Sequence, residues 1–195
     1  MAFRRFYLTI IIGIGVTASG FWPCLAQQPS LEETTAWLKD RVPQARVSLA
    51  MSSSGYLEQH VKTVTSLEFA GCNMELQVKD DVTRSWANSS DVKHYVETTS
   101  YRAALNTLVT RVQVTTEHPR NSATYTPAEW LIVNLIVAPG RAVTATTKID
   151  DGAARTSAQK GIWISIDSNY GDLGNRIATA FSYAITVCGG SKEPF

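Results

Sequence analysis

The spacing of apolar positions changes from helical at the start of the chain to strand-like through the middle and back to helical at the end. Ser30 and Glu33 have the spacing of a capping box, in which each side chain bonds the other residue's backbone amide. Apolar side chains at three- and four-residue steps then predict a helix over residues 31–42, which Pro43 ends. The same spacing predicts a last helix over residues 172–188.

Alternation of apolar and polar residues predicts about seven strands between these helices. The strands are expected over residues 61–70, 72–78, 92–100, 108–116, 130–137, 141–149 and 162–166. Residues 70–71 are expected to turn between the first two strands, and Pro139-Gly140 to form a hairpin between the fifth and the sixth. Residues 150–159 are polar and predict a loop.

Helix, strands and helix in this order predict a mainly-β α+β fold. Short, evenly spaced strands without intervening helices favour antiparallel pairing. We expect a partly open barrel of the pleckstrin-homology-like kind, with the N-terminal helix outside and the C-terminal helix capping one end. A lipocalin-like barrel, which has eight strands and a hollow interior, is the alternative. Residues 27–195 are enough for a single domain with its own core.

The first 26 residues predict a signal peptide. Arg4 and Arg5 precede an apolar run over residues 6–16, and the expected cleavage point follows Ala26. The run is too short for a membrane span, although an uncleaved anchor and a lipid attached to Cys24 stay open as alternatives. Cleavage would place the protein in the periplasm or outside the cell.

Charge and composition narrow the classes of partner. Loss of Arg4 and Arg5 with the leader leaves 16 basic and 17 acidic residues, so the formal net charge changes from +1 to −1. A mixed surface of this kind lacks the clustered positive field that nucleic-acid binding needs. No later apolar run is long enough to cross a membrane. The sequence carries no phosphate loop and no dinucleotide fingerprint, so we expect no cofactor.

Cleavage would also remove Cys24 and leave Cys72 and Cys188 as a pair. Cys72 is expected on the apolar face of a strand and Cys188 on the apolar face of the last helix, so both would point to one core. In an oxidising compartment this arrangement favours a disulfide between the helix and the sheet. Two buried free thiols are the alternative, and the isolated spacing is atypical of a metal or redox site.

Three patterns suggest chemistry, and each has a structural interpretation. Ser157 and Lys160 match the S-x-x-K spacing of serine enzymes that bind β-lactams, but they lead into a predicted strand instead of lying on a helix. Residues 167–172 resemble the start of a calcium loop without its later ligands, so we expect them to cap the last helix. The histidines lack metal-ligand spacing and are interpreted as exposed: His60, His94 and His118.

The fifth predicted strand is apolar on both faces. Alternation turns one set of its side chains inward and leaves a second apolar set outside, namely Trp130, Ile132 and Ile136. The first helix is expected to cover this second set with Leu31, Trp37 and Leu38. Otherwise the set is a partner or dimer surface.

Three segments resemble a broad set of uncharacterised secreted or periplasmic bacterial proteins. They are residues 30–38 (SLEETTAWL), residues 69–72 (FAGC) and residues 176–190 (RIATAFSYAITVCGG). The resemblance implies a pleckstrin-homology-like barrel with a closing helix, and it implies no activity and no catalytic residues. Residues 80–127 match nothing in that set.

These patterns leave two classes of function open. The first is a non-catalytic binding or scaffolding domain for a protein segment or an apolar small ligand, acting through the barrel rim and the groove beside the last helix. The second is a hydrolase with a serine site at Ser157 and Lys160, and a periplasmic lipid carrier is a further alternative. A serine gathered in a cleft with His94, Asp91 or Glu97 would favour the hydrolase.

Overall fold

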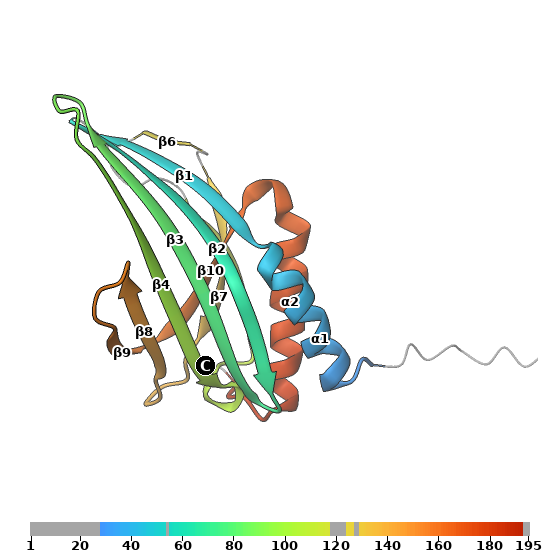
Figure 1. The fold of residues 1–195 in the computed structure, drawn as a ribbon. Helices are drawn as coiled ribbons and strands as arrows, with labels where there is room; N and C mark the ends of the chain where they lie inside the picture. The colour runs from blue at the N-terminus through green and yellow to red at the C-terminus, as the bar shows by residue number, and fades with distance from the viewer. Residues whose placement is uncertain (1–27, 54, 118–123, 127–128, 193–195) are drawn as a thin grey trace, which may run out of the picture.

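The computed structural model describes residues 28–53, 55–117, 124–126 and 129–192. Within these ranges ten strands form two antiparallel sheets, and an α-helix lies near each end of the chain (Figure 1). The prediction of a mainly-β α+β fold is therefore confirmed. The sheets do not close into a barrel, so the lipocalin-like alternative is wrong.

The larger sheet has seven strands in the order β6-β1-β2-β3-β4-β8-β9. Three long strands form its centre: β2 (Tyr56–Ala70), β3 (Asn73–Trp86) and β4 (Val92–Ala104). On one side the sheet continues with β1 (Arg46–Ser53) and β6 (Thr124–Thr126), and on the other with β8 (Val143–Ile149) and β9 (Arg155–Gln159). The sequence patterns do not predict β1, β6 or β9, and the loop expected over residues 150–159 is wrong for β9.

The smaller sheet has the order β10-β7-β5 and consists of β5 (Gln113–Glu117), β7 (Trp130–Ile136) and β10 (Gly161–Asp167). One of its faces is part of the core, with Val133, Leu135, Ile162, Ile164 and Ile166 fully buried. The hairpin predicted across Pro139-Gly140 is wrong, because β7 and β8 belong to different sheets. The chain turns at Gly140, whose φ is 76°, and passes from the smaller sheet to the larger one.

The helices begin and end as the local sequence predicts. α1 (Leu31–Arg41) starts at Ser30, whose Oγ accepts a hydrogen bond from the Glu33 amide at 3.1 Å, while Glu33 Oε2 accepts one from the Ser30 amide at 2.7 Å. A 3₁₀ turn, η1 (Val42–Gln44), follows it. α2 (Gly171–Val187) follows the turn η3 (Ser168–Tyr170), and the two α-helices lie side by side (Figure 1).

A bulge in β2 changes which of its side chains face the core. Val64 and Ser66 pair with consecutive residues of β3, so Thr65 is the extra residue. Val64 and the even-numbered positions before it face inward, whereas Leu67 and Phe69 face inward after the bulge. If Thr65 were an ordinary paired residue, a strict two-residue alternation along β2 would place Leu67 on the outer face.

The core is formed where α2 packs against both sheets. Phe181 of α2 is fully buried, and its ring lies 6.5 Å from the ring of Phe69 on β2. Leu76 of β3 and Leu105 of the 3₁₀ turn η2 (Leu105–Thr107) are also fully buried in this core. The apolar face predicted for the last helix is therefore confirmed by its packing.

A disulfide fixes the end of α2 to the long hairpin. Cys72 and Cys188 are bonded, with their Cα atoms 5.7 Å apart, so the predicted pairing is confirmed. Cys72 lies in the turn between β2 and β3, not on the strand where the alternation places it. The predicted signal peptide, including Cys24, lies outside the described residues.

Candidate functional site

The candidate site is a cavity of about 280 Å³ between the two sheets. One wall comes from β1 to β4 of the larger sheet, and the other comes from β7 and β10 of the smaller sheet. It lies on the inner face of β2, on the side of the bulge away from the disulfide. The cavity thus continues the core, but its lining has a different composition.

Cross-strand pairing sets the polar part of the first wall. Lys62, Asp80 and Glu97 are register partners on β2, β3 and β4, so their side chains leave the sheet side by side on the inner face. The next inward row contains Val78 and Thr99. Along this wall a row of charged side chains is therefore followed by a row of smaller, uncharged ones.

The opposite wall is largely apolar. Trp130, Ile132, Trp163 and Ser165 line it from the face of the smaller sheet that is turned away from its buried isoleucines. Trp163 stays 48% exposed. A Cβ atom at Gly161 would lie 3.2 Å from Cζ2 of Trp163, so the absence of a side chain at Gly161 leaves room for the indole.

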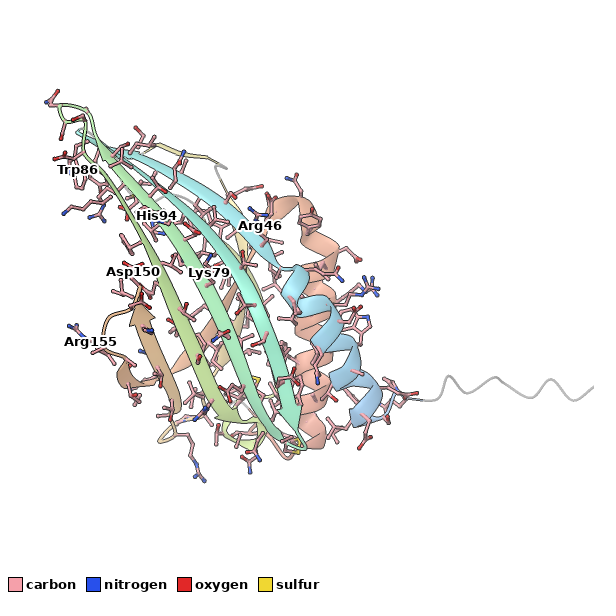
Figure 2. All side chains as sticks on the ribbon, in the orientation of Figure 1. Arg46, Lys79, Trp86, His94, Asp150 and Arg155 are labelled. Atoms are coloured by element: carbon pink, nitrogen blue, oxygen red, sulfur yellow. A yellow bond between two sulfur atoms is a disulfide. The ribbon has the colours of Figure 1, made fainter. Side chains whose placement is uncertain are left out.

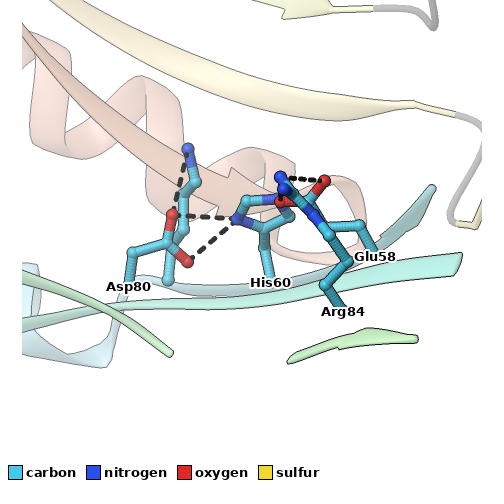
Figure 3. Close-up of polar contacts among 5 residues, drawn as sticks. Glu58, His60, Asp80 and Arg84 are labelled. Atoms are coloured by element: carbon cyan, nitrogen blue, oxygen red, sulfur yellow. Dashed lines mark hydrogen bonds and ion pairs between the residues drawn. The ribbon is translucent and has the colours of Figure 1, made fainter. Parts of the chain in front are cut away.

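A cluster of charged side chains continues the polar row along the inner face. Arg84 donates from Nη2 to both carboxylate oxygens of Glu58, at 2.8 and 2.9 Å (Figure 3). Glu58 is only 5% exposed, and this pairing meets the requirement that a buried charge have a partner. The Arg84 guanidinium also lies over the Tyr56 ring at 5.7 Å, and its buried Nε has no hydrogen-bond partner among the residues that the structure describes.

His60 links the two acidic groups of this cluster. Its Nδ1 lies 3.0 Å from Oδ2 of Asp80, and its Nε2 lies 3.4 Å from Oε1 of Glu58 (Figure 3). The Lys62 ammonium lies 3.8 Å from the same Asp80 oxygen. The prediction of an exposed His60 is therefore wrong, because its neighbours on β2 and β3 are inward-facing charges that hold the ring against the sheet.

Glu97 is the exception in this network. It is half-buried and lines the cavity, yet within the described residues no hydrogen bond or ion pair joins its carboxylate to another side chain. Its charge acts on a neighbouring phenol: burial, and after it the negative charge of Glu97, raises the pKa of Tyr101. Tyr101 also lines the cavity, so both groups share its interior.

A second hollow lies between the two helices. This groove of about 640 Å³ is lined by Trp37 of α1 and by Arg176 and Tyr183 of α2, among others. The Arg176 guanidinium lies 5.3 Å above the Trp37 ring, and the Tyr183 hydroxyl donates to the carbonyl of Pro29. A groove beside the last helix, which the sequence analysis predicts, is therefore present.

The second apolar face of β7 has a different cover from the one expected. Alternation does separate Trp130 and Ile132 from the buried Val133 and Leu135. Trp130 and Ile132, however, line the cavity opposite β2 to β4, whereas Trp37 of α1 lines the groove against α2. Cover by the first helix is thus wrong for these two positions. A partner surface that includes Ile136 stays a prediction.

The serine pattern does not form the geometry that its chemistry needs. Ser157 lies exposed on β9, where its hydroxyl accepts a hydrogen bond from Gln159 Nε2 at 3.0 Å. Lys160 follows the end of that strand, and extended backbone places residues i and i+3 roughly 10 Å apart. The helical turn that would bring the lysine to the serine is absent here.

The other predicted positions are dispersed. His94 pairs with Asp81 at 2.6 Å on the outer face of the sheet, Asp91 is exposed, and His118 lies outside the described residues. Glu97 and Ser165 both line the cavity, so a serine does share a cleft with one of the three predicted residues, but among the described residues no hydrogen bond joins the two side chains and His94 does not line this cavity. Asp167 accepts a hydrogen bond from the Asn169 amide at 2.9 Å and caps the turn η3, whereas Tyr170 precedes α2 without a side-chain cap, so the cap expected for the last helix is wrong.

The sequence analysis missed the charged cluster because charged residues are not expected on the buried face of a strand. Glu58, His60 and Lys62 recur at two-residue steps, and Asp80 and Arg84 lie four residues apart and so share one face, which means that the strand period is present. The inward residues are charged, however, and the apolar alternation that predicts β3 stops at residue 78. The cluster could have been found from charged residues at alternate positions of one strand that face residues of opposite charge on the neighbouring strand.

Three findings bear on the class of protein. Neither helix in the described part of the chain combines the length and apolar character needed to cross a membrane. Among the same residues, no three histidine, cysteine, aspartate or glutamate side chains gather as a metal site would require. Comparison with protein-family models, curated proteins and solved structures finds no significant match, so membership of the secreted family stays a prediction.

Proposed function

We propose that this chain is an exported, non-catalytic binding domain that holds a small, partly apolar molecule in the cavity between its sheets. The observation that carries the proposal is the composition of that cavity. Aromatic and aliphatic side chains form one wall, and a few polar groups occupy fixed places on the other. Small-molecule sites in proteins have this combination, in which apolar surface gives affinity and polar groups give orientation.

The size of the cavity limits the ligand. About 280 Å³ lies just below the range of roughly 300–1,000 Å³ that drug-sized ligands occupy. A compact molecule with one ring or a short branched chain fits such a volume, whereas a lipid with two acyl chains does not. We therefore favour a small-ligand binder over a lipid carrier.

The disulfide supports the exported part of the proposal. Disulfides persist in oxidising compartments and are rare in the cytosol. The Cys72–Cys188 bond joins elements 116 residues apart, and it fits the signal peptide predicted over the first 26 residues. Periplasmic or secreted location is thus part of the proposed function.

Two neighbouring threonines offer a test with a matched control. Thr99 lines the cavity, and the adjacent Thr98 leaves β4 on the opposite face. Thr99→Trp should fill the cavity, whereas Thr98→Trp adds the same side chain outside it. Small molecules that accompany each protein through purification from the cell envelope are released by denaturation and identified by mass spectrometry.

The expected result is a compound bound by the wild-type protein and by Thr98→Trp but lost from Thr99→Trp. Circular dichroism and thiol titration show whether both variants keep the fold and the disulfide. Equal amounts of every compound in the two folded variants would overturn the proposal, since the filled cavity would then have no bearing on what the protein carries.

A further inference from the structure

The charges around the cavity point to one class of ligand. Resting on the proposed small-ligand function, we infer that the bound molecule is a small organic cation, a protonated or quaternary amine with an apolar body. Glu97 would bind the cationic centre, and the aromatic wall with Trp130 and Trp163 would receive the rest of the molecule.

The first step is the balance of charge inside the cavity. Three ionised side chains line it: Lys62, Asp80 and Glu97. Lys62 lies 3.8 Å from Asp80, and His60 bonds the same carboxylate, so Asp80 already has cationic or hydrogen-bonding neighbours. One negative charge, that of Glu97, is left without a partner among the described residues.

The second step is the cost of leaving that charge unmatched. A ligand that displaces water from the cavity removes the solvation of the half-buried Glu97 carboxylate. A neutral apolar ligand supplies nothing in return, and an anion adds repulsion between like charges. A cation replaces the lost solvation with a charge-assisted contact, which is about twice as strong as a neutral hydrogen bond.

The third step is the aromatic lining. Cations bind favourably within about 6 Å of an aromatic centroid, most strongly for tryptophan, and desolvation increases the effect. Tyr101, Trp130 and Trp163 supply three aromatic side chains in one cavity with Glu97. A carboxylate beside several aromatic groups is the lining that suits an ammonium with an apolar body.

Three probes of similar ring size separate the classes of ligand. Benzyltrimethylammonium is the cation, benzyl alcohol the neutral compound and benzoate the anion. Binding to the exported protein with its disulfide intact is measured by isothermal titration calorimetry. Two-dimensional NMR of the tryptophan indole N–H groups reports whether each probe reaches Trp130 and Trp163.

Two charge-removing variants complete the design. Glu97→Gln removes the carboxylate in the cavity and keeps its shape. Glu32→Gln removes the same charge from an exposed site in the first turn of α1, so it measures the effect of net charge alone. The neutral probe provides a second control, because its affinity should not depend on either substitution.

The expected result is that the cation binds roughly tenfold or more tightly than the neutral probe, and that Glu97→Gln removes this preference while Glu32→Gln keeps it. Equal binding of the cation and the neutral probe, or a preference that survives Glu97→Gln, would overturn the cation inference and leave the cavity as a binding site. If no probe shifts the Trp130 and Trp163 signals, both this inference and the proposed function are overturned.

Discussion

The inner face of the long strands has two halves that differ in kind. On the disulfide side of the bulge, Leu67, Met74 and Leu76 are almost fully buried against α2. On the other side the same strands turn Glu58, His60 and Asp80 inward, and these side chains pair with one another. One sheet therefore provides a dry core at one end and a paired polar surface beside a cavity at the other.

The difference shows that a single sheet can be packed tightly at one end and border a cavity at the other. Apolar burial contributes about 25 cal/mol per Å², so the first half stabilises the fold through contact with α2. The second half has little such contact, and paired charges there roughly offset their own desolvation. A cavity bounded by the second half can change its lining without removing the packing that holds the sheet to the helix.

The largest expected effect concerns the disulfide, which fastens the apolar half. Cys72→Ser and Cys188→Ser should each lower the free energy of unfolding by up to about 4–5 kcal/mol, because the bond closes a long loop in the unfolded chain. The double variant should add little to either single one. Denaturant titration measures all three, and additive losses would contradict a role that depends on the bond between them.

The second effect tests the polar half. Glu58→Gln should destabilise the protein by about 1–3 kcal/mol, because it weakens the bond to Arg84 and leaves that cation without its counter-charge. Glu58→Leu combined with Arg84→Met should recover most of the loss, since an apolar pair replaces an ionic one. If the double variant is less stable than either single variant, the attraction between Glu58 and Arg84 stabilises the fold by more than their desolvation costs.

The boundary between the halves offers a third test. Deleting Thr65 removes the extra residue of the bulge and keeps every inward side chain of β2 inward, so we expect a loss of only about 1 kcal/mol, for its hydrogen bonds to Gln77. Deleting Thr63 also removes the bulge, but it places Thr65 in the buried position of Val64 and turns Val64 outward, so it should cost about 1–3 kcal/mol more than deleting Thr65. Urea unfolding compares the two, and a similar outcome for both would refute the assignment of Thr65 as the bulge residue.

The smallest effect is a pH dependence at the border of the cavity. Burial raises the pKa of Tyr101 above its usual value, so the folded state disfavours the ionised phenol. The contribution of Tyr101 to the free energy of unfolding is fully present below about pH 10, the pKa of a tyrosine in the unfolded chain. It is lost as the pH rises through the higher pKa of the folded state. Tyr101→Phe should flatten the alkaline decline in stability, and Tyr170→Phe, at an exposed phenol, should leave it unchanged.

Local features could be predicted from the sequence, and pairing at long range could not. The cap at Ser30, the apolar face around Phe181 and the cysteine pair each depend on near neighbours or on elimination, and all three are confirmed. The turn at Gly140 is also present, yet its flanking strands pair in different sheets. A turn determines that the chain bends, but the partner of each strand depends on the whole sheet.

The strands that the sequence analysis missed show that a strand is recognised from hydrophobic alternation only where one of its faces is buried and apolar. β9 is exposed along most of its length, so its residues do not alternate in hydrophobicity, although it pairs fully with β8. The second half of β3 turns Asp80 and Arg84 inward, which ends the apolar alternation while the strand continues to Trp86. The sequence analysis names Glu97 for the hydrolase alternative, but it could not place Glu97 beside Asp80, because that pairing depends on the part of β3 that the apolar pattern does not predict.

The long hairpin is anchored at one end only. The Cys72–Cys188 bond lies at the turn between β2 and β3. Trp86 lies at the opposite end of the hairpin, which extends beyond the helices (Figure 2). Backbone amides near the projecting end can exchange with solvent through fraying, but those near Asn73 exchange only when the anchored base opens.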